Sequence, residues 1–144
     1  KHIDDYSHNR RRVAQRYSEA LTGAGIQIPY EDGKGLHVYH QYTLLHEERD
    51  SIMNALQEKS IACAVYYPIP LHKQDVYMEA YNDSHLPITE SVTEKCFSLP
   101  VYPELENDSI DTIINVIKGA LQAPEPLPAF NTGKQGSILE TTAL

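Results

Sequence analysis

The chain has 144 residues, of which 41% are hydrophobic and 22% charged, enough for one ordinary domain with a core of its own. Its formal net charge is −8, and residues 10–12 form its one dense basic cluster. Because nucleic acids and anionic membranes bind a surplus of Lys and Arg, we expect neither as a partner. The sequence has no apolar run near the ~20 residues of a membrane span and no signal-peptide core, which predicts a cytoplasmic protein.

Apolar periodicity predicts a first helix over residues 4–22, ended by Gly23. This helix starts at the very first residues without a clear cap, so we expect it to be the end of something longer. A short strand over residues 26–29 and a glycine-rich turn over residues 31–35 follow. Residues 36–45 form the best predicted strand, because valine, threonine and two tyrosines favour a pleated sheet.

The second half of the chain predicts further short elements. Leu86-Pro87 precedes a helix start, at which Thr89 is the expected cap. The elements are a helix over 47–59, a buried strand over 61–65, a short turn or helical turn over 73–77, a polar loop over 82–85, a helix over 90–95, a strand over 96–99 and a helix from 107 or 108 to 121. Residues 123–144 are rich in Pro, then in Gly, Ser and Thr, and predict a linker or a flexible tail.

The order of these elements predicts an α/β (α+β-like) domain with a small, mostly antiparallel sheet covered by helices. A parallel dinucleotide-binding sheet is disfavoured, because no glycine fingerprint follows any predicted strand.

Neither the cysteines nor the histidines predict a metal site. Cys63 and Cys96 stand beside apolar residues and are expected to be free thiols, with a disulfide as the alternative. His37 and His40 are three positions apart, so on a strand they point to opposite faces and cannot bind one ion. No CxxC or HExxH pattern recruits another ligand.

Residues 65–72, which we call the tyrosine–proline segment, are the most distinctive stretch. Pro68 and Pro70 fix their own φ and push the residue before each toward extended geometry. A stiff strand exit with polar groups at its ends suggests groups that are aimed at a ligand, and the alternative is a surface loop that happens to hold two tyrosines. The polar groups are the phenols of Tyr66 and Tyr67 and the imidazole of His72.

Five stretches share their order and spacing with one known family: residues 11–17, 37–42, 66–74, 86–90 and 98–105. Over residues 9–121 the chain resembles the C-terminal domain of the DegT/DnrJ family. These are pyridoxal-phosphate-dependent aminotransferases that act on nucleotide-linked keto-sugars. The resemblance implies that residues 1–122 are the small C-terminal domain of a fold-type I aminotransferase, with residues 1–22 as an inter-domain helix.

The resemblance also implies a function for the full-length protein. We expect a cytoplasmic homodimer that transfers an amino group from glutamate to a nucleotide-linked keto-sugar, in amino-sugar biosynthesis for a cell-surface polysaccharide or a natural product. The cofactor, pyridoxal 5′-phosphate, is expected on a lysine of an N-terminal domain, so no catalytic residue is expected in this chain. The alternative is a stand-alone ligand-binding or regulatory module of the same fold.

By resemblance, the substrate-binding residues of this chain are Tyr66, Tyr67 and His72, which border the sugar-nucleotide site, often that of the partner subunit. Many family members carry His where this chain has Tyr66. A phenol and an imidazole suit sugar hydroxyls or a diphosphate, both of which are recognised by hydrogen bonds. His40 and Tyr42 are interpreted instead as core residues of the central strand.

Overall fold

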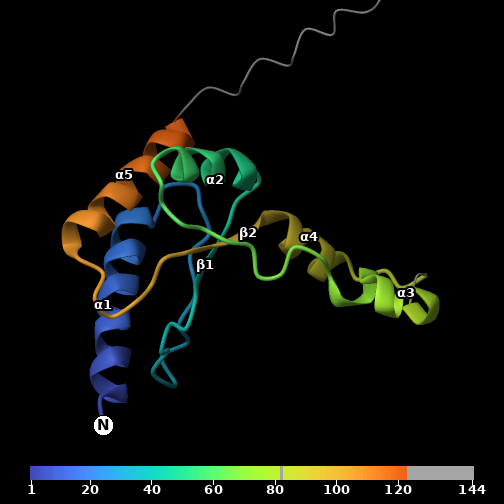
Figure 1. Ribbon diagram of the computed structural model, residues 1–144, viewed down its shortest axis with the longest axis horizontal. Helices are drawn as coiled ribbons and strands as arrows, with labels where there is room; N and C mark the ends of the chain where they lie inside the picture. The colour runs from blue at the N-terminus through green and yellow to red at the C-terminus, as the bar shows by residue number, and fades with distance from the viewer. Residues whose placement is uncertain (82, 123–144) are drawn as a thin grey trace, which may run out of the picture.

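Two short antiparallel strands and the helices on one of their faces form the body of the domain (Figure 1). The structure is a computed structural model that describes residues 1–81 and 83–122. The elements are α1 (Ile3–Leu21), β1 (Tyr42–Leu45), α2 (Arg49–Glu58), the 3₁₀ turn η1 (Leu71–Lys73), α3 (Asp75–Tyr81), α4 (Pro87–Lys95), β2 (Cys96–Leu99) and α5 (Asn107–Gln122). The predicted tail, residues 123–144, lies outside the described residues.

The register of the sheet decides which face is buried. Tyr42 pairs with Leu99 and Leu44 pairs with Phe97, and these four side chains point to the same face. That face joins one core with the apolar stripes of α1, α2 and α5, and all four side chains are at most 4% exposed. The predicted helix-covered antiparallel sheet is therefore confirmed.

Helices α1, α2 and α5 follow their sequence signals, whereas α3 (Asp75–Tyr81) forms a longer helix than the turn or helical turn predicted over residues 73–77. The first helix lacks a side-chain cap, as predicted, and Gly23 lies just after its end with a φ of +76°. Two ion-pair contacts hold α1 to α5: Arg16 Nε lies 2.9 Å from Oδ1 of Asp111, and Nη2 lies 2.6 Å from Oδ2. Within the described part of the chain, no helix is long and apolar enough to cross a membrane.

The sheet is smaller than the sequence predicts. Residues 36–41 are a loop rather than part of a strand, because Tyr39 takes a φ of +45° and turns its side chain into the core. The strands predicted over 26–29 and 61–65 are each reduced to one isolated bridge, Gln27 with Leu45 and Ala64 with Ser98. The chain there stays extended but has too few partners to extend the ladder.

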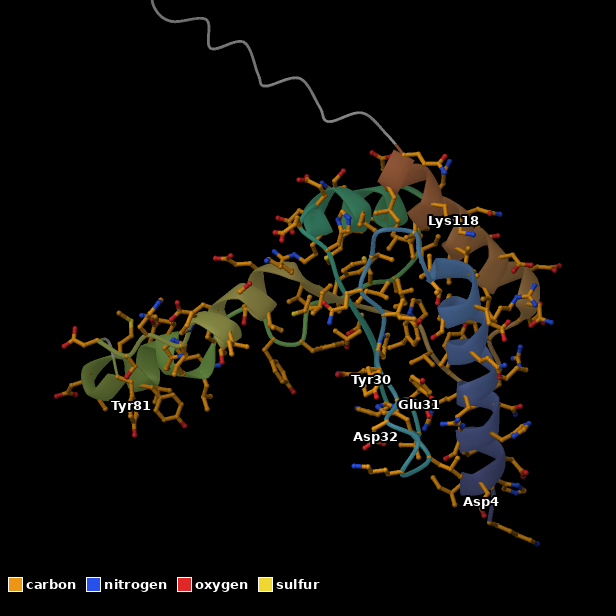
Figure 2. All side chains as sticks on the ribbon, turned by 180° about the vertical axis from the view of Figure 1, so that it is seen from behind. Asp4, Tyr30, Glu31, Asp32, Tyr81 and Lys118 are labelled. Carbon is orange, nitrogen blue, oxygen red and sulfur yellow. The ribbon has the colours of Figure 1, made fainter. Side chains whose placement is uncertain are left out.

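The chain leaves the body after β1 and α2 to build a projecting arm of η1, α3 and α4 (Figure 1). Helix α4 begins at Pro87, earlier than predicted, and Thr89 lies inside it rather than at its cap. Figure 2 shows Tyr81 toward the outer end of the arm, far from Glu31 on the loop that runs beside α1. Both cysteines are free thiols, as predicted.

Candidate functional site

The tyrosine–proline segment starts at the edge of the sheet and runs out toward the arm. Ala64, just before it, bridges to Ser98 of β2. The next two tyrosines are accessible, since Tyr66 is 50% exposed and Tyr67 is 74% exposed. Their rings lie edge to face, with centroids 6.1 Å apart. The segment therefore presents two phenols at the surface of the domain, as its sequence predicts.

His72 lies at the other end of the segment and has a different environment. It is buried, and its Nε2 lies 2.9 Å from Oε1 of Glu90 in α4. The structure thus brings Tyr66 and Tyr67 together at the surface and places His72 against α4. That His72 touches a substrate directly stays a prediction.

A depression of about 380 Å³ adjoins Tyr66 on the sheet face that the helices leave uncovered. Its polar lining includes His40, Gln41, Ser98 and Tyr102. The expectation that His40 is a core residue is wrong, because the side chain is exposed, a consequence of the turn at the preceding residue. The depression thus places hydroxyl, amide and imidazole groups next to the phenol of Tyr66.

The hydroxyls of Thr43 and Ser98 meet on this uncovered face, with their Oγ atoms 2.9 Å apart. Thr43 also lines a second depression, to which His40 and Gln41 contribute as well. Sequence reasoning did not single out Thr43, Ser98 or Gln41. The alternation of side chains along a strand could have identified Thr43, because it places Thr43 on the face opposite the buried Tyr42 and Leu44.

Tyr42 takes the position expected of it. It is fully buried, and its hydroxyl lies 2.9 Å from Oγ of Ser18 in α1. Burial raises the pKa of Tyr42 above its usual value, so the phenol stays neutral. Tyr42 therefore stabilises the junction of sheet and helix and offers no group to a ligand.

The carboxylate of Glu90 is the most heavily engaged acidic group near the segment. The hydrogen bond from His72, followed by that from the backbone of Leu86, lowers the pKa of Glu90 below its ordinary value. Its other oxygen lies 3.1 Å from Nδ1 of His85. The carboxylate is thus ionised at neutral pH and occupied by contacts within the arm.

The described lysines do not fit a pyridoxal-phosphate site. Lys1, Lys34, Lys59 and Lys73 are exposed, Lys118 is only partly buried on α5, and Nζ of Lys95 lies 2.8 Å from Oε1 of Glu47. An amine that forms a Schiff base needs a desolvated or charge-tuned setting, which these positions do not provide. Burial raises the pKa of Cys63 and of Cys96, which disfavours the thiolate form of both side chains.

The site is therefore a set of hydrogen-bonding groups on a rigid domain. Phenols, an amide and hydroxyls suit a polyhydroxylated ligand, and the described residues hold no group of three His, Cys, Asp or Glu side chains that could bind a metal.

The chain belongs to the DegT/DnrJ/EryC1/StrS aminotransferase family, whose sequence profile matches residues 1–118. It is 38% identical over 120 residues to the UDP-N-acetyl-3-dehydro-alpha-D-glucosamine 3-aminotransferase of Acidithiobacillus ferrooxidans, covering 83% of this chain and 32% of that protein. The chain thus spans about a third of the length of the curated relatives it matches.

Solved structures agree with this assignment. DesV of S. venezuelae, in complex with a ketimine intermediate, superimposes with a TM-score of 0.82 at 27% identity, over 86% of this chain and 34% of that one. The putative sugar aminotransferase Spr1654 of Streptococcus pneumoniae, solved in its PLP form, shares the fold with a TM-score of 0.73 at 23% identity, over 81% of this chain and 31% of that one. The chain is homologous to the C-terminal region of sugar-nucleotide aminotransferases.

Proposed function

We propose that this chain is the small C-terminal domain of a pyridoxal-phosphate-dependent aminotransferase. The full-length protein transfers the amino group of glutamate to the carbonyl carbon of a nucleotide-linked keto-sugar. Glutamate becomes 2-oxoglutarate, and the ketone becomes an amine. The observation that carries this proposal is the family match over residues 1–118, together with the relative that acts on a UDP-linked 3-dehydro sugar. The product would serve amino-sugar biosynthesis for a cell-surface polysaccharide or a natural product.

In this proposal residues 1–122 form the small domain, α1 leads in from the cofactor domain, and residues 123–144 are a linker or tail. Ile3 is 66% exposed and Tyr6 is 43% exposed in the first turns of α1. Apolar side chains left open at a helix start support a further domain that covers them. The cofactor is proposed to bind that domain, since the described lysines here do not fit it.

Tyr66, Tyr67 and His72 are proposed to serve the sugar-nucleotide site. The support for the tyrosines is the exposure of both side chains and the depression that Tyr66 lines together with His40, Gln41 and Tyr102. A phenol can both donate to and accept from sugar hydroxyls or diphosphate oxygens. In a cytoplasmic homodimer, which we also propose, this surface would face the substrate of the partner subunit.

The test is an amino-transfer assay of the full-length protein with pyridoxal phosphate. UDP- and dTDP-linked keto-sugars are offered as acceptors, with glutamate, glutamine and alanine compared as donors. We expect amination of at least one nucleotide keto-sugar, with glutamate as the preferred donor. Failure to aminate any acceptor, while the protein binds its cofactor, would overturn the proposal and favour a non-catalytic module.

A control uses the isolated chain of 144 residues. Mixed with pyridoxal phosphate and reduced with borohydride, it is expected to trap no stoichiometric adduct. A stoichiometric adduct on one lysine would contradict the assignment of the cofactor to another domain.

A further inference from the structure

The tyrosine–proline segment is pinned at both ends to one continuous piece of the chain. At its start, Ser98 N donates to Ala64 O at 2.7 Å, and Ala64 N donates to Ser98 O at 3.3 Å. At its end, Nε2 of His72 lies 2.9 Å from Oε1 of Glu90. Ser98 belongs to β2 and Glu90 to α4, and α4 runs directly into β2 (Figure 1). The α4–β2 unit therefore carries both attachment points.

Between these attachment points the backbone has little support of its own. In the described structure, residues 65–69 make no backbone–backbone hydrogen bond. Pro68 and Pro70 restrict the torsion angles of the segment but do not fix its position relative to the sheet. The positions of Tyr66 and Tyr67 therefore depend on the attachments at the two ends of the segment.

At the second attachment point, near His72, the contact between His72 and Glu90 is largely shielded from solvent. The side chain of His72 is 7% exposed and that of Glu90 is 26% exposed. Glu90 also accepts a hydrogen bond from the backbone N–H of Leu86 at 3.1 Å, which holds its carboxylate at the start of α4. His85, which pairs with the other oxygen of Glu90, is 77% exposed, and such a contact is screened by solvent.

Helix α4 is itself attached to the body of the domain. Nη1 of Arg49 donates to the carbonyl of Thr93 at 2.7 Å, and Lys95 pairs with Glu47 at 2.8 Å. Glu90 therefore stands on a helix whose C-terminal end is joined to the start of α2. Through its contact with His72, Glu90 can therefore fix the position of the tyrosine–proline segment relative to the body of the domain.

We propose that Glu90 is a positioning residue for the sugar-nucleotide site. Its carboxylate holds His72, and His72 fixes where Tyr66 and Tyr67 are presented. The proposal rests on the proposed function, because it assigns the segment to the same substrate site. It gives His72 a role that its buried position allows, as the anchor of the segment.

The test compares Glu90→Ala, His72→Ala and the double variant in the full-length enzyme. Each single variant is expected to lose about 10- to 100-fold in kcat/KM for the nucleotide keto-sugar, because a displaced segment misplaces its binding groups. The half-reaction with glutamate should stay within about twofold. The double variant should lose no more than the worse single one, because both remove the same contact.

Glu94→Ala is the matched control, since Glu94 is an exposed acidic residue one turn further along α4. Glu90→Gln, which keeps an oxygen that can accept from His72, should recover most of the activity lost in Glu90→Ala. Additive losses in the double variant, equal losses in both half-reactions, or the same loss in Glu94→Ala would each overturn the proposal.

Hydrogen exchange of the full-length protein gives a readout that does not depend on activity. The amides of Lys73 and Gln74, which donate to the carbonyls of Pro70 and Leu71 beside His72, should exchange faster in Glu90→Ala and unchanged in Glu94→Ala. Unchanged exchange in Glu90→Ala would overturn the proposal even if activity fell. Failure of the proposed function would look different, because the wild-type protein would then aminate no nucleotide keto-sugar.

Discussion

The hydroxyl of Tyr17 in α1 donates a hydrogen bond to the carbonyl of Pro100, just after β2, at 3.1 Å. Tyr17 is fully buried, and its ring centroid lies 5.1 Å from that of Tyr42. Burial raises the pKa of Tyr17 far above its usual value, so the phenol remains a donor at any ordinary pH. This polar contact thus ties the first helix to the exit of the sheet within the core.

Replacement of Tyr17 by Phe should therefore lower stability. The variant keeps the ring and its packing but leaves the Pro100 carbonyl without its donor, which costs about 1–3 kcal/mol. Urea denaturation followed by circular dichroism measures the loss. Tyr30→Phe is the control, because Tyr30 is 86% exposed and the change should be close to neutral. Equal stability of the two variants would contradict the prediction.

A second prediction concerns the loop that runs beside α1 (Figure 2). Oη of Tyr39 donates to Oε1 of Glu31, and Arg11 Nη1 pairs with Oε2 of Glu31 at 3.0 Å. Burial, followed by the hydrogen bond to Glu31, raises the pKa of Tyr39 to about 12. The unfolded phenol titrates near pH ~10. The stabilisation from this group is therefore complete below pH ~10 and is lost as the pH rises toward about 12.

Tyr39→Phe should accordingly destabilise the protein at neutral pH and less so in alkali. Urea midpoints of the wild type and the variant, measured from about pH 8 to about pH 11, should converge as the pH rises. The wild type loses stability there because its unfolded state releases a proton that the folded state retains. A gap between the two proteins that stays constant with pH would contradict this assignment.

The sequence predicted the helices better than the sheet, for a physical reason. The apolar stripes of α1 and α5 are local signals, and the core formed by residues such as Val13 and Ile117 follows from them. The strand over residues 36–45 failed at Tyr39, whose buried side chain and contact with Glu31 favour a turn over the extended backbone that its β-propensity predicts. Tertiary contacts, rather than local propensity, determine the backbone conformation at Tyr39.

The site was predictable in part. The stiffness of the tyrosine–proline segment and the exposure of its tyrosines follow from the two prolines and from the end of the apolar run at Val65. The burial of His72 does not follow, because its partner Glu90 lies 18 positions further along the chain. The sequence places Glu90 only at the start of the predicted helix over residues 90–95, and its pairing with His72 across the intervening α3 required the fold.

The last prediction tests the exposed phenols in the full-length enzyme. Tyr67→Phe removes one hydroxyl from a side chain that is 74% exposed, so the fold should be unaffected. Loss of one hydrogen bond to the substrate should raise KM for the nucleotide keto-sugar about 2- to 10-fold, with the glutamate half-reaction unchanged. Tyr81→Phe is the control, since Tyr81 is 52% exposed and lies at the end of α3, toward the outer end of the arm (Figure 2). Tyr66→His should be tolerated within about threefold, because an imidazole can also donate and accept. Steady-state kinetics with both substrates measure these KM values. An equal rise in KM for Tyr67→Phe and Tyr81→Phe would contradict the prediction that Tyr67 binds the substrate.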